Sequence, residues 1–208
     1  MLTLKKIAIT GGIASGKTTV CRVFQELGAC VVYADDIAHE LLTPSTEVGQ
    51  RVIKVFGQTI LKQGKIDRRA LAELAFQNSE SLNQLEKILH PAIVRRIEEL
   101  YREARKTGTY TSFVVEIPLL YEIKQESFYD KVIAVLADEE LCRKRFTESG
   151  FSSDDYDRRM RRHLSPKQKS AKADFVIHNN KTLDHLRKEV VHINQSIQTE
   201  SHGSRTSN

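Results

Sequence analysis

The sequence has few cysteines, no long apolar run and no secretion signal. Its three cysteines, Cys21, Cys30 and Cys142, are odd in number and form no CxxC pair, which argues against a disulfide framework and against a zinc site. We expect each of them to be a small buried hydrophobe. No apolar stretch is long enough to span a bilayer, and the first residues lack the apolar core of a signal peptide. These absences predict a cytoplasmic protein with no membrane partner.

The net charge is positive, and two kinds of partner would explain it. The 208 residues carry a formal net charge of +5, which suits either a nucleic acid or a small polyanionic substrate. Basic residues gather between Arg143 and Lys172, where the only aromatic side chains are Phe146, Phe151 and Tyr156. A surface that stacks single-stranded bases normally carries more aromatic side chains than this. We therefore expect no nucleic-acid partner, and part of the basic stretch is explained by an ordinary solvated surface.

Short apolar runs alternate with amphipathic helical patterns along most of the chain. The runs that predict buried strands lie at 6–10, 30–33, 113–117, 131–136 and 175–177. The helical patterns that surround them lie at 17–27, 139–146, 152–163 and 181–197. Strands that alternate with helices predict an α/β fold with a mainly parallel sheet.

The stretch between the second and third predicted strands has an almost wholly helical pattern. Asp67 is expected to cap a helix through Phe76, and Ser79 is expected to begin another. Pro91 fits the first turn of a third helix, because the N–H that proline lacks would have no partner there. This helical stretch is expected to cover the carboxyl edge of the sheet, where ligands bind in such folds.

A glycine-rich motif follows the first predicted strand and opens the first predicted helix. Residues 11–18, GGIASGKT, match the P-loop pattern GxxxxGK[ST] in the context that the pattern requires. Its glycines let backbone N–H groups approach phosphate oxygens, and the helix N-terminus adds partial positive charge. Lys17 would reach the β- and γ-phosphates, while the Thr18 hydroxyl would ligate Mg²⁺. The motif predicts nucleotide binding; GTPases and motor ATPases share it, although no clear NKxD-type guanine signature follows.

Two acidic residues stand at the ends of predicted strands. Asp35 follows the second strand, where a carboxylate could orient an attacking hydroxyl or accept its proton. It could equally cap the next helix, a role that Asp36 could take instead. Glu116 ends the third strand, where an acid is costly unless it is paired or faces a metal ion. A position near Mg²⁺ and an ion pair with a lysine or arginine are both open for Glu116, and we favour the metal.

Several motifs, in this order, resemble those of the dephospho-coenzyme A kinase family. They are ITGGIASGKTTV at 9–20, ADDIA at 34–38, LHP at 89–91, IPLLYE at 117–122 and ADFVIHN at 173–179. The P-loop is common to many families, whereas the LHP and PLLxE elements are much more specific. The resemblance spans the chain from about 7 to 193.

The resemblance implies a P-loop kinase fold, with a five-stranded parallel sheet flanked by helices. It implies one domain over 1–198, built from a core at 1–38, 109–138 and 173–198, a helical acceptor-binding insert at 39–108 and a helical lid at 139–172. The remaining residues, 199–208, are polar and are expected to be a disordered tail. The implied reaction is phosphorylation of the ribose 3′-hydroxyl of dephospho-coenzyme A by ATP with Mg²⁺, which is the last step of coenzyme A synthesis. Oligomeric state is left open between a monomer and a weak homo-oligomer.

The same resemblance assigns roles to individual residues. The catalytic residues would be Asp35 and Lys17, and the metal would be held at Thr18 and Glu116. The acceptor would contact Asp35, His90, Pro118, Leu119, Leu120 and Glu122. The nucleotide would contact Gly12, Ile13, Ala14, Ser15, Gly16, Lys17, Thr18, Thr19, Arg145 and Asn179. For His90, the residues alone favour a packed side chain, and the resemblance favours substrate contact.

Some positions depart from the family pattern. Tyr33 replaces an acid, His39 replaces an arginine, and Ala14 replaces a loop glycine at a position that we expect to be permissive. In the lid, Lys144 and Glu148 stand where arginines are common. The positive charge that stabilises the transferred phosphate would then come from Arg143, Arg145, Arg159 or Arg162, and the sequence does not say which. His163 stands where the family often has glutamine. The P-loop and Asp35 are intact, so we expect an active enzyme.

Two rival functions remain possible on the sequence. A nucleoside or nucleoside-monophosphate kinase shares the core, insert and lid, but the LHP and PLLxE elements argue against it. A nucleotide-gated nucleic-acid-binding protein would use the P-loop as a switch and the basic lid as a contact, and it would bind nucleic acid in a salt-dependent way.

Overall fold

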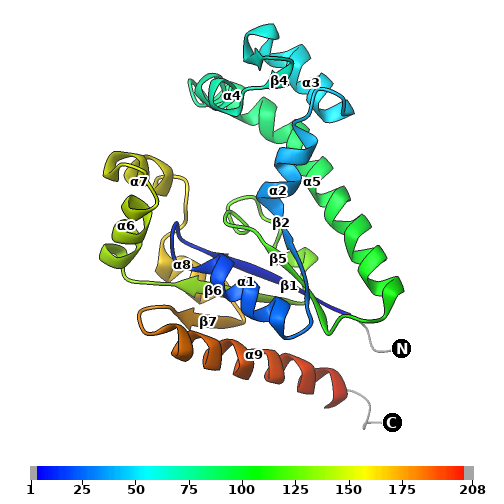
Figure 1. The fold of residues 1–208 in the computed structure, drawn as a ribbon, viewed down its shortest axis with the longest axis vertical. Helices are drawn as coiled ribbons and strands as arrows, with labels where there is room; N and C mark the ends of the chain where they lie inside the picture. The colour runs from blue at the N-terminus through cyan, green and yellow to red at the C-terminus, as the bar shows by residue number, and fades with distance from the viewer. Residues whose placement is uncertain (1–3, 204–208) are drawn as a thin grey trace. The chain divides into compact units, whose positions relative to one another are not determined.

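The computed structural model describes residues 4–203 and divides them into two compact units. The first unit runs to Val32 and resumes at Ala104, and the second comprises Tyr33–Glu103. The first unit holds the sheet, and the second is mostly helical (Figure 1). The predicted division of one domain into core, insert and lid remains an interpretation of these segments.

A five-stranded sheet forms the centre of the first unit. Its strands stand in the order β2-β5-β1-β6-β7, and they are β1 (Lys5–Gly11), β2 (Cys30–Tyr33), β5 (Ser112–Glu116), β6 (Lys131–Leu136) and β7 (Phe175–His178). The pairs β1–β5, β1–β6 and β6–β7 are parallel. Parallel strands bring their carboxyl ends to one edge. The P-loop after β1, Pro118 after β5 and Asn179 after β7 therefore share that edge.

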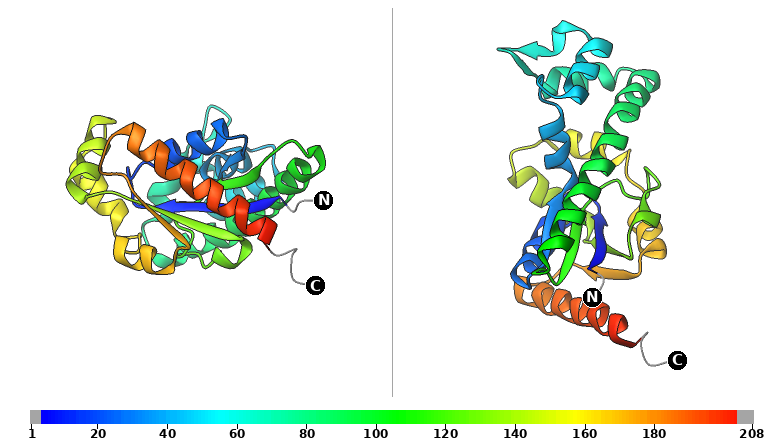
Figure 2. Two further views of the ribbon diagram at one scale, coloured as in Figure 1. Left: turned by 90° about the horizontal axis from the view of Figure 1, so that it is seen from below. Right: turned by 90° about the vertical axis from the view of Figure 1, so that its right-hand side faces the viewer.

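Helices cover the sheet and bury its apolar faces. α1 (Lys17–Glu26) packs beside α9 (Leu183–Gly203), while α8 (Pro166–Lys172) packs against β1 and β6. In the right-hand view of Figure 2, α1 and α8 lie on opposite sides of β1. The fully buried strand residues, such as Ile7, Ile9 and Ile133, form the core between these layers. This burial on both faces explains why the strands read as continuous apolar runs.

Two parts of this unit differ from expectation. α9 continues to Gly203, past the predicted start of a disordered tail at 199, and Glu200 forms an ion pair with Lys131 at 2.8 Å. The rest of that predicted tail, 204–208, lies outside the described residues. Cys21 and Cys142 are buried as expected, whereas Cys30 is only half-buried.

The predicted lid, 139–172, contains three helices, and the last of them, α8, packs against the sheet. From here on, the lid means the first two helices and the connection that follows them, 139–164. α6 (Glu139–Glu148) and α7 (Ser153–Met160) join through an apolar cluster made of Cys142, Phe146 and Tyr156. Ile13 and Ala14 of the P-loop pack against this cluster. The lid helices therefore rest directly on the phosphate loop.

The second unit has its own apolar core. α3 (Glu47–Phe56), α4 (Arg68–Ala75) and α5 (Ser79–Thr107) pack around Val52, Ile60 and Leu71. Asp67 caps α4, as predicted, and accepts from the backbone N–H groups of Arg69 and Ala70. Such a cap contributes about 1 kcal/mol to helix stability.

The second unit also contains a short hairpin that the helical pattern conceals. β3 (Leu61–Lys62) pairs antiparallel with β4 (Lys65–Ile66). The two residues between them, Gln63 and Gly64, both have positive φ, at 52° and 73°. Positive φ at both central positions is typical of a two-residue hairpin turn, and glycine is the residue type that favours it. The Gly64 position was the sequence signal for this turn.

The prediction of a helix break at Pro91 is wrong. α5 is a single helix from Ser79 to Thr107, with Pro91 in its interior. Proline there removes one backbone donor but leaves the φ angle helical. Buried Ile88, Ala92 and Ile97 continue one apolar stripe across it, so packing on both sides holds the helix together despite the lost hydrogen bond.

Candidate active site

The P-loop forms the turn between the central strand and the first helix. β1 ends at Gly11, and α1 begins at Lys17 after Gly16, which has a left-handed φ of 98°. The Lys17 ammonium group donates to the carbonyl oxygen of Gly12 at 2.8 Å. The lysine charge is therefore held over the loop whose N–H groups the motif assigns to phosphate.

Asn179 fixes the P-loop from the far strand of the sheet. Its side-chain amide donates to the carbonyl oxygen of Ser15 at 2.9 Å, and the side chain is buried. A Cβ atom on Gly16 would lie 2.1 Å from that amide nitrogen. Glycine at this position is required both by the left-handed φ and by the approach of Asn179.

Ala14 has a backbone conformation that alanine rarely adopts. Its φ is 53°, in the left-handed region, where the conformation of an L-residue costs about 1–2 kcal/mol of free energy. The expectation that this is a permissive position is therefore wrong. The methyl group packs on the lid cluster, which offsets part of the strain.

A hydroxyl and a carboxylate lie side by side at the start of α1. Thr18 Oγ1 donates to Glu116 Oε2 at 3.0 Å. The Cys21 thiol, buried one helical turn later, also hydrogen-bonds to Glu116. Burial, with the Glu116 charge next in size, raises the pKa of the Cys21 thiol. The thiol therefore stays protonated beside the Glu116 carboxylate.

This pair of oxygen ligands fits a hard divalent cation. Mg²⁺ prefers oxygen ligands and usually takes only one or two from the protein, with phosphate and water completing its shell. Thr18 is exposed, whereas the Glu116 side chain is nearly buried. Within residues 4–203 no group of three or more His, Cys, Asp or Glu side chains gathers as a metal site. The Thr18–Glu116 pair thus suits a cation that arrives with nucleotide phosphates.

The loop after β5 is held by a buried ion pair. Glu122 Oε1 lies 2.9 Å from the Lys169 ammonium group, and the two side chains are 13% and 1% exposed. The same oxygen accepts from the backbone N–H of Leu164 at 2.7 Å. Burial, opposed by the Glu122 hydrogen bond, lowers the pKa of Lys169. The resemblance assigns Glu122 to the acceptor, but in this structure one oxygen of its carboxylate is bound to Lys169 and to the Leu164 N–H.

His163 lies beside this ion pair and is held neutral. Burial, followed by the nearby charge of Lys169, lowers the pKa of His163 to about 4, although Glu122 acts in the opposite direction. Its Nδ1 atom is buried and has no hydrogen-bond partner among the described residues. A neutral imidazole here avoids placing another cation next to Lys169.

Known proteins that are similar to this chain identify its family. The family model described as "Dephospho-CoA kinase" matches residues 5–185. The chain belongs to the dephospho-CoA kinase family. It is 47% identical over 191 residues to the dephospho-CoA kinase of Chlamydia pneumoniae, covering 91% of this chain and 95% of that one. The family resemblance read from the motifs is therefore confirmed.

Solved structures give the same answer for the fold. The dephospho-CoA kinase of Campylobacter jejuni superposes with a TM-score of 0.62 at 31% identity, over 94% of this chain and 98% of that one. A protein from Thermus thermophilus superposes with a TM-score of 0.80 at 28% identity, over 93% and 97%. The predicted P-loop kinase fold is confirmed, and membership of the dephospho-CoA kinase family makes the chain an ATP-dependent transferase.

In this family member, the lid arginines have definite partners. Arg143 donates to Asp157 at 2.7 Å and to Glu139 at 3.0 Å, and the Arg159 guanidinium lies over the Phe151 ring at 4.6 Å. These contacts join α6 to α7 and leave Arg143 and Arg159 less suited to phosphate. Arg145 of α6 differs, because it donates to the backbone carbonyl of Asn179 at 3.2 Å. Asn179 is the residue whose side chain binds the P-loop at Ser15, so Arg145 lies close to that loop.

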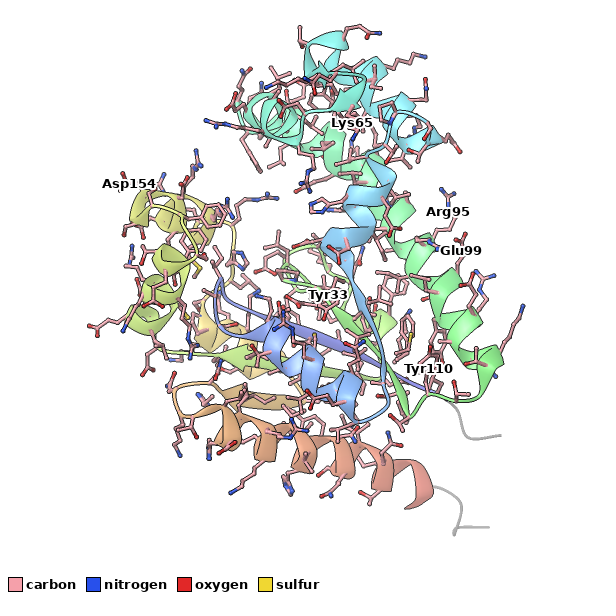
Figure 3. The ribbon with its side chains drawn as sticks, in the orientation of Figure 1. Tyr33, Lys65, Arg95, Glu99, Tyr110 and Asp154 are labelled. Carbon is pink, nitrogen blue, oxygen red and sulfur yellow. The ribbon has the colours of Figure 1, made fainter. Side chains whose placement is uncertain are left out.

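Asp35 and His90 belong to the second unit. α2 (Ala34–Leu41) begins directly after Tyr33, which is labelled in Figure 3 and occupies the N-cap position without a capping hydrogen bond from its side chain to the helix. The capping role that was open for Asp35 or Asp36 is therefore wrong for both. Each is exposed in the first turn, where the positive end of the helix favours a carboxylate. His90 lies within α5 and is half-buried.

Sequence reasoning missed Lys169 and the role of Asn179 as a clamp on the P-loop. Lys169 looked like one lysine among many in a basic stretch, and no local pattern marked it as buried. The spacing of Ser165, Pro166 and Gln168 did carry a signal, since these residues form the capping box and first turn of α8. That signal would have placed a helix there, with Lys169 on one of its faces.

Proposed function

We propose that this chain transfers the γ-phosphoryl group of ATP to the ribose 3′-hydroxyl of dephospho-coenzyme A. Family membership carries this proposal, and the P-loop geometry supports it. In the reaction the bond between the γ-phosphorus and the bridging oxygen breaks, while a bond from the 3′-oxygen to that phosphorus forms. ADP leaves, and the hydroxyl proton passes to a base.

The P-loop residues would bind and orient the nucleotide. Gly12 to Thr19 would present backbone N–H groups to the phosphates, and Lys17 would shift from the Gly12 carbonyl to the β- and γ-oxygens. The lid would contribute Arg145 near the same loop. Asn179 would hold the loop in shape, and its predicted contact with the nucleotide stays a prediction. Protein groups that already point at the phosphates lower the barrier to phosphoryl transfer, because they need not reorganise when the transition state forms.

Thr18 and Glu116 would hold Mg²⁺, the hydroxyl directly and the carboxylate directly or through water. When bound, the ion neutralises charge on the β- and γ-phosphate oxygens. Thr18 Oγ1 already donates to the Glu116 carboxylate, and the protonated Cys21 thiol lies beside the same carboxylate. Removal of magnesium by EDTA is expected to abolish turnover.

Asp35 would accept the proton of the acceptor hydroxyl or orient it. His90, Pro118, Leu119 and Leu120 would line the acceptor side, as the family motifs imply. Glu122 would act there through the loop that it holds, because its carboxylate is already bound to Lys169. A cytoplasmic location and a monomer or weak homo-oligomer remain predictions, and within the described residues no helix is long and apolar enough to cross a bilayer.

Acceptor identity is tested by the release of ADP from Mg-ATP. We would compare dephospho-coenzyme A, adenosine, AMP, CMP and no acceptor, and would locate the new phosphate by ³¹P and proton NMR. Strong stimulation by dephospho-coenzyme A alone, with product phosphorylated at the 3′-oxygen, is expected. Stimulation by a nucleoside or nucleotide instead would refute the assigned acceptor. An ATP-dependent gel shift with DNA or RNA at physiological salt would favour the rival function, a nucleotide-gated nucleic-acid-binding protein.

The role of Asp35 is tested against its neighbour. Asp35→Asn should lower kcat on the order of 10²–10⁴-fold, the usual contribution of a general base, while the KM for ATP stays within about twofold. Asp36→Asn is the matched control, because both side chains are exposed in the first turn of α2. Near-normal turnover of Asp35→Asn would remove this residue from the chemistry.

A further inference from the structure

One lysine of the first unit is completely buried. Lys169 has 0% exposure, and its ammonium group donates to Glu122 at 2.9 Å and to the carbonyl oxygen of Pro118 at 2.7 Å. Buried ammonium groups are rare because removing them from water is costly. Burying this ammonium group lowers the stability of the protein, and in return the lysine holds its two partners in fixed positions.

The Pro118 carbonyl connects Lys169 to the phosphate loop. The Pro118 carbonyl accepts from Lys169 and also from the Thr10 hydroxyl at 3.1 Å. Thr10 is buried in β1, directly before the glycine that opens the P-loop. Movement of Pro118 would therefore be transmitted to the strand that carries the P-loop.

The second partner connects Lys169 to the end of the lid. One oxygen of Glu122 accepts from the Lys169 ammonium group and from the backbone N–H of Leu164. Leu164 lies just after α7 and just before α8. The lid therefore returns to the sheet at this carboxylate, and its other end is joined by Arg145 to the Asn179 carbonyl.

The helix that presents Lys169 is short but firmly started. Ser165 and Gln168 form a reciprocal capping box, and Pro166 occupies the first turn. α8 packs against β1 and β6. The lysine is thus delivered from a fixed helix, so it can hold the loop and the lid end in place.

We propose that Lys169 is a positioning residue for phosphoryl transfer, which fixes the end of the lid and the loop 118–122 against the sheet. This inference rests on the proposed function, because the lid and this loop are assigned there to the two substrates. Lys169 touches neither substrate, so its effect passes through Pro118, Glu122 and Leu164. Since the lid acts on the charge of the transferred phosphate, the loss of this anchor should lower kcat more than it raises the KM for ATP.

Stability and positioning can be separated with a double variant. Lys169→Met leaves the Glu122 carboxylate buried without its cation, so both the Tm and kcat should fall. Adding Glu122→Gln removes that orphan charge, while the amide oxygen can still accept from Leu164. The double variant should therefore regain most of the lost Tm. Its kcat should stay lower than that of the unaltered enzyme by about tenfold or more, with a KM for ATP within about threefold.

Lys167→Met is the matched control, because it removes a lysine from the exposed side of the same helix. It should leave the Tm, kcat and KM unchanged. If the double variant regains both the Tm and full kcat, Lys169 has only a structural role and the proposal is overturned.

Hydrogen exchange tests the same idea without an acceptor. With a non-hydrolysable ATP analogue, amides of residues 153–164 should become protected in the unaltered enzyme and less so in the double variant. Equal protection in both would overturn the proposal. An unaltered enzyme that dephospho-coenzyme A does not stimulate would instead refute the proposed function, and the exchange experiment would still decide the role of Lys169.

Discussion

The P-loop and the return of the lid to the sheet handle charge in opposite ways. The P-loop is one continuous stretch, with its cation Lys17 bound to a carbonyl of the same loop and Thr18 exposed. The lid return joins Pro118, Glu122 and Lys169, and its cation is sealed from water. In the P-loop the ammonium group is bound to a neutral carbonyl, which a phosphate oxygen could replace. At the lid return the ammonium group is bound to a carboxylate of the protein itself.

This difference shows which features a local sequence can specify. A loop that binds phosphate through its backbone depends on glycine at particular φ angles, and residues within a few positions fix those angles. A buried ion pair depends on where two distant segments meet, so its residues carry no mark of their own. The P-loop is accordingly recognisable from a pattern, and the lid return is visible only when the sheet is formed.

The largest expected effect breaks the P-loop at Gly16. In Gly16→Ala, the added Cβ would lie 2.1 Å from the Asn179 amide nitrogen and would impose strain at a φ of 98°. Asn179 must then leave the Ser15 carbonyl, and the displaced loop should lower kcat/KM by about 10²-fold or more. Steady-state kinetics and the Tm are the measurements.

Gly12→Ala is the control for this prediction in the folding measurement. No atom lies within 4 Å of a Cβ at Gly12, so the Tm should stay close to that of the unaltered enzyme. If Gly16→Ala and Gly12→Ala lower the Tm equally, the Asn179 clamp does not determine the shape of the loop.

The second prediction sharpens the comparison at the lid return through pH. The pKa of His163 is lowered to about 4 by burial and by Lys169, Lys17 and Arg162, with Glu122 opposing. Between an unfolded value of about 6.5 and about 4, the unfolded chain binds more protons than the folded one. Stability is therefore complete above the upper value and should be lost as the pH falls through this window.

His163→Gln should make the free energy of unfolding depend less steeply on pH within that window, because glutamine does not titrate. Chemical denaturation at several pH values measures this slope, and His178→Gln serves as an exposed histidine control. An unchanged slope in His163→Gln would show that the folded protein lets this imidazole charge freely.

The smallest expected effect concerns Ala14, where the P-loop meets the lid. Ala14→Gly relieves the strain of a φ of 53° but loses a methyl contact with the lid cluster and adds freedom to the unfolded chain. These terms nearly cancel, so the protein should become more stable by between 0 and about 1 kcal/mol. A lower stability of Ala14→Gly, measured by denaturant titration, would show that the methyl packing outweighs the strain.

Much of the core was predictable because its signals are local. The apolar runs gave all the strands of the main sheet to within about a residue, and Asp67 marked the start of α4. The interior position of Pro91 was not predictable in this way, because packing of Ile88, Ala92 and Ile97 outweighs the lost hydrogen bond. The Gln63–Gly64 hairpin was hidden because its strands are too short to show alternation.

The sequence by itself determined the family, the phosphate-binding loop and the order of strands and helices. Each of these depends on residue types at short fixed spacings, where backbone conformation and periodic burial are decided locally. Only the tertiary structure decided that Asn179 clamps Ser15, that Glu116 faces Thr18 and Cys21, and that Lys169 is buried against Glu122. Those contacts join strands and helices that are distant in the chain, and they exist because a parallel sheet brings the carboxyl ends of its strands to one edge.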